Sequence, residues 1–79
     1  GNNPLEHTAV SDKVEQVRLL IASLPEKQRT CLHLRDFEGK SYREISQIMS
    51  ITEEQVKVSI FRARQTIKQK FQKIDEYGL

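Results

Sequence analysis

The sequence is poor in the residues that build several classes of site. Its 79 residues include one cysteine, two prolines, three glycines and no tryptophan. A single cysteine excludes a disulfide framework and any multi-cysteine zinc site. No apolar run approaches the ~20 residues that span a bilayer, and no signal peptide is visible. The scarcity of turn residues, with many Lys, Glu, Gln, Leu and Ile, favours helices.

Residues with catalytic or metal-binding chemistry are scattered along the chain. His7 and His33 have no partner at metal-ligand spacing, and Cys31 falls on a predicted apolar stripe, where a thiol is inert. The sequence has no glycine-rich phosphate loop and no nucleophile paired with a base. A chain this short also leaves little room for an enclosed active site. We therefore expect no catalytic residue, no metal and no cofactor in a non-enzymatic, cytoplasmic protein.

Apolar residues recur at helical spacing in four segments, and no window alternates with the period of a strand. Asp12 is the predicted N-cap of the first helix, and Pro25 is expected to end it and open the second. Gly39 is expected to cap the second helix in a left-handed conformation. The predicted inward residues are Val14, Val17, Ile21, Leu24, Cys31, Leu32, Leu34, Phe37, Tyr42, Ile45, Ile48, Met49, Val56, Ile60, Ala63, Ile67, Phe71 and Ile74.

The third and fourth predicted helices form a helix-turn-helix pattern. Ser41 and Glu44 have the spacing of a capping box, as do Thr52 and Gln55 at the start of the fourth helix. Residues 50–52 make a short break, which Ile51 is expected to fill from inside. The predicted fold is all-α: a four-helix domain of the three-helical, winged-helix-like DNA-binding type without strands.

Charge is balanced in the first half of the chain and strongly positive in the predicted fourth helix. The net charge is +2, but residues 57–73 contain six basic side chains and no acidic one. Such a segment indicates a helix that faces a polyanion, although a solvated helix face has the same composition. The motifs elsewhere in the sequence decide between these two interpretations.

The ordered run of motifs resembles region 4 of bacterial sigma factors, most closely the small extracytoplasmic-function (ECF) type. The resemblance covers roughly residues 12–74. The sequence departs from the common pattern at Ser46, Ser50, Glu54, Gln55, Val58 and Ser59. The residues that carry the resemblance are Leu24-Pro25-Glu26-Lys27-Gln28-Arg29, Cys31, Leu34, Arg35, residues 38–46, Ile51-Thr52, Val56-Lys57 and Phe61-Arg62-Ala63-Arg64.

The resemblance implies a domain that recognises the −35 promoter element and docks on the β-subunit flap of RNA polymerase. It implies double-stranded DNA as the ligand, and an anti-sigma factor would be a further partner. No membrane contact is expected, and the isolated domain is expected to be monomeric. The candidate DNA-binding residues are Lys57, Val58, Phe61, Arg62 and Gln55 on the fourth helix, with Lys40, Ser41, Tyr42 and Arg43 at the start of the third.

Several of these residues have a second interpretation. Val58 and Phe61 lie opposite the predicted core stripe, so they either contact DNA or pack against a neighbouring segment. Arg62 suits a guanine edge or a phosphate, and Tyr42 suits the core or DNA. Arg64 and Arg29 are expected to pair with acids on other helices.

Two other functions fit the same helical pattern. One is the helix-turn-helix effector domain of a dimeric response regulator; the other is an anti-sigma-type module whose exposed apolar residues bind a partner helix. Residues 1–11 are predicted to be a linker or cloning remnant, and residues 12–79 the sigma region 4 domain. The opening Gly-Asn-Asn-Pro suggests a fragment of a longer protein.

Overall fold

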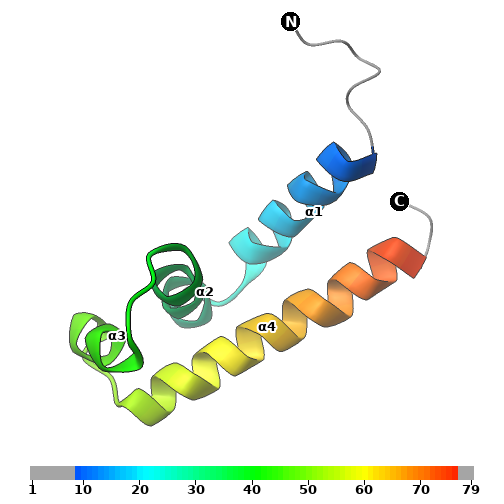
Figure 1. Cartoon of the computed structure of the whole chain (residues 1–79). Coiled ribbons are helices and arrows are strands. Elements are labelled where there is room, and N and C mark those ends of the chain that lie inside the picture. Colours follow the sequence, from blue (N-terminus) through cyan, green and yellow to red (C-terminus); the bar gives the residue numbers. More distant parts are fainter. Residues whose placement is uncertain (1–8, 77–79) are drawn as a thin grey trace, which may run out of the picture.

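The chain folds as a helical domain, shown by a computed structural model that describes the backbone of residues 9–76 and the side chains of residues 12–73 (Figure 1). No strand occurs within this described part, which confirms the all-α prediction. None of its helices is both long and apolar enough to cross a membrane. In chain order the elements are α1 (Ala9–Ser23), α2 (Glu26–Leu32) with its π-helical continuation η2 (His33–Phe37), α3 (Tyr42–Met49) and α4 (Glu53–Glu76).

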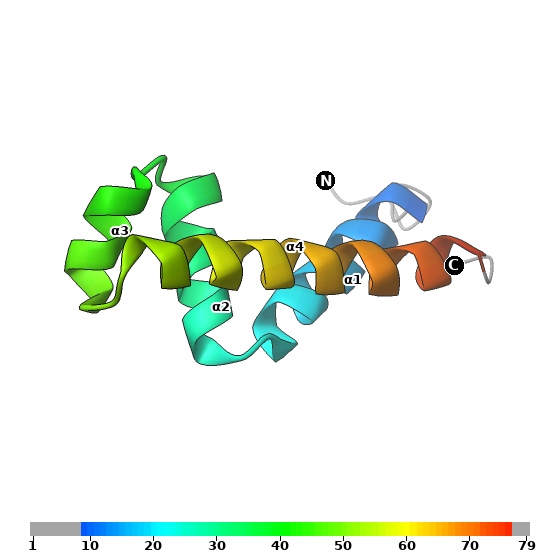
Figure 2. The same cartoon turned by 90° about the horizontal axis from the view of Figure 1, so that it is seen from below.

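Helix α4 forms the long axis of the domain and contacts the three other α-helices. Its 24 residues span about 36 Å at 1.5 Å per residue. Figure 2 shows α1 along the C-terminal half of α4, and α2 and α3 against its N-terminal half. The first half of α4 therefore packs against α2 and α3.

The core lies between α2, α3 and the first half of α4. Ile21, Tyr42, Met49, Ile51 and Ile67 pack around it, partly buried. Its buried members are Leu24, Cys31, Leu32, Leu34, Ile45, Val56, Ile60 and Ala63.

The α1–α2 joint is built around Pro25, which takes the N-cap position of α2 and accepts the amide hydrogen of Arg29 through its carbonyl. A proline cannot continue α1 because it lacks an N–H and clashes with the preceding turn. The Arg29 guanidinium donates to the Ala22 carbonyl, 3.1 Å away. The prediction that Arg29 pairs with an acid is therefore wrong, because the guanidinium caps the end of α1 instead.

Helix α2 ends in a wider, π-helical turn, in which the Glu38 amide donates to the His33 carbonyl five residues earlier. The extra residue in this turn rotates Phe37 away from the direction that a period of 3.6 predicts. Phe37 is exposed and stacks on His33, so its predicted core position is wrong. Gly39 follows with a φ of 70°, the predicted left-handed conformation.

The helix-turn-helix is confirmed by the local chemistry of its turn. Ser50 adopts a left-handed conformation with φ 57°, and the Ile51 amide donates back to the Ser46 carbonyl. Ile51 packs against the core, as predicted. These contacts fix the direction in which the chain enters α4.

Three further predictions about the helices need correction. Helix α1 begins at Ala9 and not at Asp12, so residues 9–11 are not a linker; residues 1–8 lie outside the described part. Val14 is exposed because Ile21 is the residue of α1 that packs against the core, near the end of the helix, and Leu24 follows just after that end. Ile48 is exposed because it lies about 60° from Ile45 on the side of α3 away from the core, whereas Met49 lies about 40° from Ile45 on the core side. Ile74 lies outside the residues whose side chains are described.

Candidate nucleic-acid interface

Helix α4 has one buried side and one exposed side. Val56, Ile60 and Ala63 are buried in the core. On the opposite side, Val58 is 38% and Phe61 66% exposed. No neighbouring segment within the described residues covers the Phe61 ring, which confirms the helical phase predicted for these residues. Arg62 is exposed beside them, so one side of α4 offers apolar groups and a guanidinium to solvent.

The capping box predicted at the start of α4 is present. The Thr52 amide donates to Gln55 Oε1 at 3.1 Å, and the Gln55 amide donates to Thr52 Oγ1 at 3.0 Å. This reciprocal pair fixes the first turn of α4. Gln55 uses its side-chain oxygen in the cap, which leaves its NH₂ group as a hydrogen-bond donor for another partner.

A second capping box holds the start of α3. The Ser41 hydroxyl accepts from the Glu44 amide, and the Ser41 amide donates to the Glu44 carboxylate at 2.9 Å. This hydrogen bond from the backbone lowers the pKa of Glu44. Ser41 and Glu44 are thus engaged with each other, whereas the amides of Tyr42 and Arg43 lie in the first turn of α3 without an intrahelical acceptor.

The Tyr42 ring joins the two ends of the helix-turn-helix. The Arg35 guanidinium carbon lies 4.8 Å from the ring centroid, and the Lys57 ammonium of α4 lies 5.8 Å from it. Arg35 also donates to the Lys40 carbonyl at 2.9 Å. Tyr42 is partly buried against the core, so it combines its core interpretation with two cation–π contacts. The predicted residues Tyr42 and Lys57 are thereby brought together on one flank of α4, and the Lys40 carbonyl lies beside Arg35.

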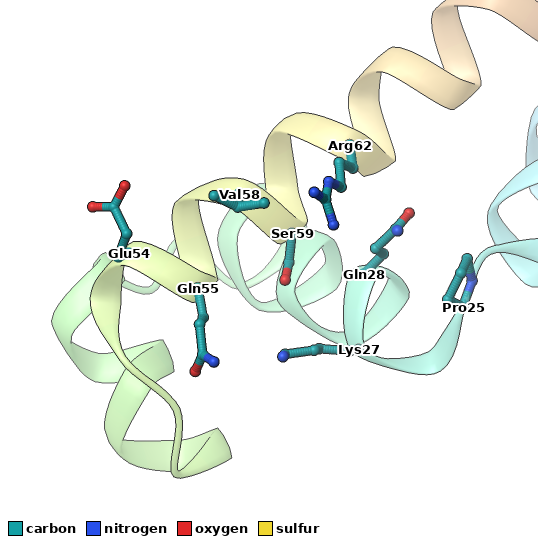
Figure 3. A pocket seen from close by; sticks show the side chains of 8 residues that line it. All are labelled: Pro25, Lys27, Gln28, Glu54, Gln55, Val58, Ser59 and Arg62. Carbon is teal, nitrogen blue, oxygen red and sulfur yellow. The ribbon is translucent and has the colours of Figure 1, made fainter.

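An open hollow of about 360 Å³ lies on the other flank of α4 (Figure 3). Lys27 and Gln28 of α2 contribute to it and were not among the predicted site residues. Only the packing of α2 on α4 brings them beside Arg62, and no local motif signals this. The complete lining is Pro25, Lys27, Gln28, Glu54, Gln55, Val58, Ser59 and Arg62.

Arg64 has a structural role, as predicted. Its guanidinium forms an ion pair with Asp36 of η2, with Nη2 2.5 Å from Oδ1. The hydrogen bond to this carboxylate raises the pKa of Arg64. The pair connects α4 to the end of the α2–η2 segment. It also directs the Arg64 side chain away from the side of α4 that exposes Val58, Phe61 and Arg62.

The remaining titratable candidates do not gather as metal ligands in the described part of the chain. Cys31 is fully buried, and burial raises the pKa of its thiol. His33 lies 3.3 Å from the Glu38 carboxylate. Among residues 9–76, no three His, Cys, Asp or Glu residues come together as metal ligands.

Comparison with known proteins points to one family. Residues 14–67 match the family described as sigma-70, region 4. The chain is 41% identical over 68 residues to the RNA polymerase sigma-H factor of Pseudomonas aeruginosa, covering 85% of this chain and 35% of that protein. It is 40% identical over 72 residues to the ECF RNA polymerase sigma-E factor of Escherichia coli, covering 90% and 37%. The Haemophilus influenzae sigma-E factor is 38% identical over 68 residues, covering 85% and 36%. The chain thus spans just over a third of the length of these relatives.

Proposed function

Because the chain belongs to the sigma-70 region 4 family, we propose that it recognises the −35 element of promoters as part of an RNA polymerase sigma factor. It would act at transcription initiation, where chromosome and polymerase meet in the cytoplasm. The observation that carries this proposal is the exposed side of α4. There, Val58, Phe61 and Arg62 project from a helix whose other side is buried in the core.

A major groove about 12 Å wide admits one α-helix, and side chains in its floor read base edges. Arg62 can donate two hydrogen bonds to guanine, whereas Val58 and Phe61 suit thymine methyl groups. Lys57 lies at the margin of this surface, held beside Tyr42, where a phosphate would be within reach. Gln55 can add its free amide group, and Lys40, Ser41 and Arg43 place the start of α3 along one DNA strand.

The polymerase contact is the second part of the proposal. An open, largely apolar hollow of about 300 Å³ lies between α1, the α2–η2 segment and α4, and Ile21, Leu32, Phe37, Ile67 and Phe71 contribute to it. It is distinct from the hollow beside Val58. We assign the β-subunit flap to this surface, because an apolar segment can bind there while the side of α4 that exposes Val58, Phe61 and Arg62 stays free for DNA. An anti-sigma factor would inhibit by covering either surface.

The test measures DNA binding by the Arg62→Ala variant. The parent chain first selects duplexes from a random library, and fluorescence anisotropy then measures the affinity of parent and variant for these duplexes. If Arg62 reads a guanine, its removal costs ~1–3 kcal/mol at one base position; if it meets a phosphate, the loss is uniform across sequences. Affinity should fall by about 0.9 log units per log unit of salt for each phosphate contacted. Lys73→Gln is the control, because Lys73 lies more than four turns beyond Val58 on the same helix.

Two results would contradict the proposal. One is an affinity that does not depend on salt, and the other is equal binding by Arg62→Ala and Lys73→Gln. Either would show that α4 does not bind in the major groove. Two chains on a two-fold symmetric footprint would favour the response-regulator alternative; the relatives named above are sigma factors.

A further inference from the structure

The DNA-facing side of α4 has two flanks, and the predicted phosphate contacts occupy only one. A helix in the major groove has a sugar–phosphate strand on each side of it. Lys57 lies over Tyr42, which puts the start of α3 along the first flank. The second flank is the side of α4 that carries Gln55, Ser59 and Arg62 toward α2.

We propose that the hollow on this second flank seats a phosphate of the opposite DNA strand, with Lys27 and Gln28 of α2 as its additional ligands. The inference rests on the proposed DNA-binding function and extends it to a helix that contributed no predicted contact. Val58 and Arg62 belong both to the groove-facing side of α4 and to the lining of the hollow, so the hollow opens onto the DNA-facing surface.

The side chains around the hollow suit an anion. Figure 3 shows Lys27 extending beneath α4 and the Arg62 guanidinium directed toward Gln28 on α2. Ammonium, guanidinium and side-chain amides are the usual donors to phosphate oxygens. Gln55 retains its NH₂ group for this purpose because only its oxygen is used by Thr52.

The two cations lack a carboxylate partner within the described residues, where the ion pairs join other side chains. The lining also contains Glu54, so two positive groups stand against one negative group. In Figure 3 the Glu54 carboxylate points away from Lys27 and Arg62. A phosphate would relieve the repulsion between Lys27 and Arg62, whereas Glu54 at the edge would weaken its binding.

The experiment compares Lys27→Gln with Lys73→Gln, two exposed lysines that lose the same charge. Binding of the 79-residue chain to its selected duplex is followed by anisotropy between about 50 and 200 mM salt. We expect Lys27→Gln to reduce the salt slope by about 0.9, the value for one phosphate contact, and Lys73→Gln to change it much less. Glu54→Gln should tighten binding. Circular-dichroism melts check that each variant folds like the parent.

Single methylphosphonate substitutions, which remove one phosphate charge, then locate the contact. At the phosphate that Lys27 contacts, this substitution should lower the affinity of the parent chain and leave the affinity of Lys27→Gln unchanged. The affinity of Arg43→Gln should be unchanged by substitution of a different phosphate, which lies on the opposite strand. Both contacts on one strand, or equal behaviour of Lys27→Gln and Lys73→Gln, would overturn the inference.

Failure of the underlying function would look different. If the parent chain binds no duplex, the proposed function and the inference fall together. If Arg62→Ala and Lys57→Gln weaken binding and Lys27→Gln does not, the function stands and only the second-strand contact is lost.

Discussion

Neighbouring residues Ile60 and Phe61 give a direct test of how α4 is oriented, because truncating each should affect a different property. Ile60 is 2% exposed in the core, and Phe61 is 66% exposed on the opposite side. Cutting a buried isoleucine to alanine costs ~2–5 kcal/mol through lost burial and the cavity left behind. Full burial of a phenylalanine contributes ~1.5–3 kcal/mol, so the one third of Phe61 that is covered should contribute less than about 1 kcal/mol.

These values are large against the stability of so small a domain. At ~0.05–0.15 kcal/mol per residue, this chain should be stable by ~4–12 kcal/mol. Ile60→Ala should therefore lower the melting temperature by at least about 8 °C, since each kcal/mol shifts it by ~4–8 °C at this size. Phe61→Ala should shift it by only a few degrees and weaken DNA binding instead.

The assay pairs thermal melting with anisotropy on the same protein samples. Ile60→Val, expected to cost ~0.5–1.5 kcal/mol, provides a measurement if Ile60→Ala does not fold. Equal destabilisation by Phe61→Ala and Ile60→Ala would show that the helical phase is wrong. The assignment of residues 57–62 to the groove would then be lost with it.

Two further expectations concern the turns that flank α3. Ser50 has a φ of 57°, so Ser50→Gly should relieve the strain of a side chain in the left-handed region and stabilise the domain by roughly 0.5–1 kcal/mol, less the entropy that glycine gains on unfolding; an unchanged or lower melting temperature would contradict this. The Ser41 amide lowers the folded pKa of Glu44, so the contribution of this pair is present above the ordinary glutamate pKa and is lost as pH falls through the lowered value. Melts between neutral and acidic pH should show a weaker acid dependence for Glu44→Gln, and identical profiles would exclude Glu44 as a contributor.

Features encoded within a few residues were predictable from the sequence. Both capping boxes depend on pairs three residues apart, Ser41 with Glu44 and Thr52 with Gln55. The exposed position of Phe61 follows from the same local periodicity, since each residue advances about 100° around an α-helix. Such features require no knowledge of how the helices pack together.

The errors arise where geometry or packing departs from that periodicity. The π-helical turn from His33 moves Phe37 out of phase with the rest of α2, and nothing in the residue types announces the wider turn. Arg29 bonds to a backbone carbonyl because α1 ends beside it. Lys27 enters the candidate site only through the packing of α2 on α4. Non-local contacts of this kind have no sequence period to reveal them.

The acidic start of α4 connects stability with the proposed function. Glu53 and Glu54 lie in its first turn, where negative charge favours the partial positive end of the helix. The same carboxylates repel phosphates next to a surface built to meet DNA. A free DNA-binding domain would lose affinity by this arrangement. A domain held near its promoter by polymerase, as proposed here, gains effective concentration from that attachment and can bind weakly by itself. Moderate affinity then lets base contacts by Arg62 and its neighbours decide where the protein binds.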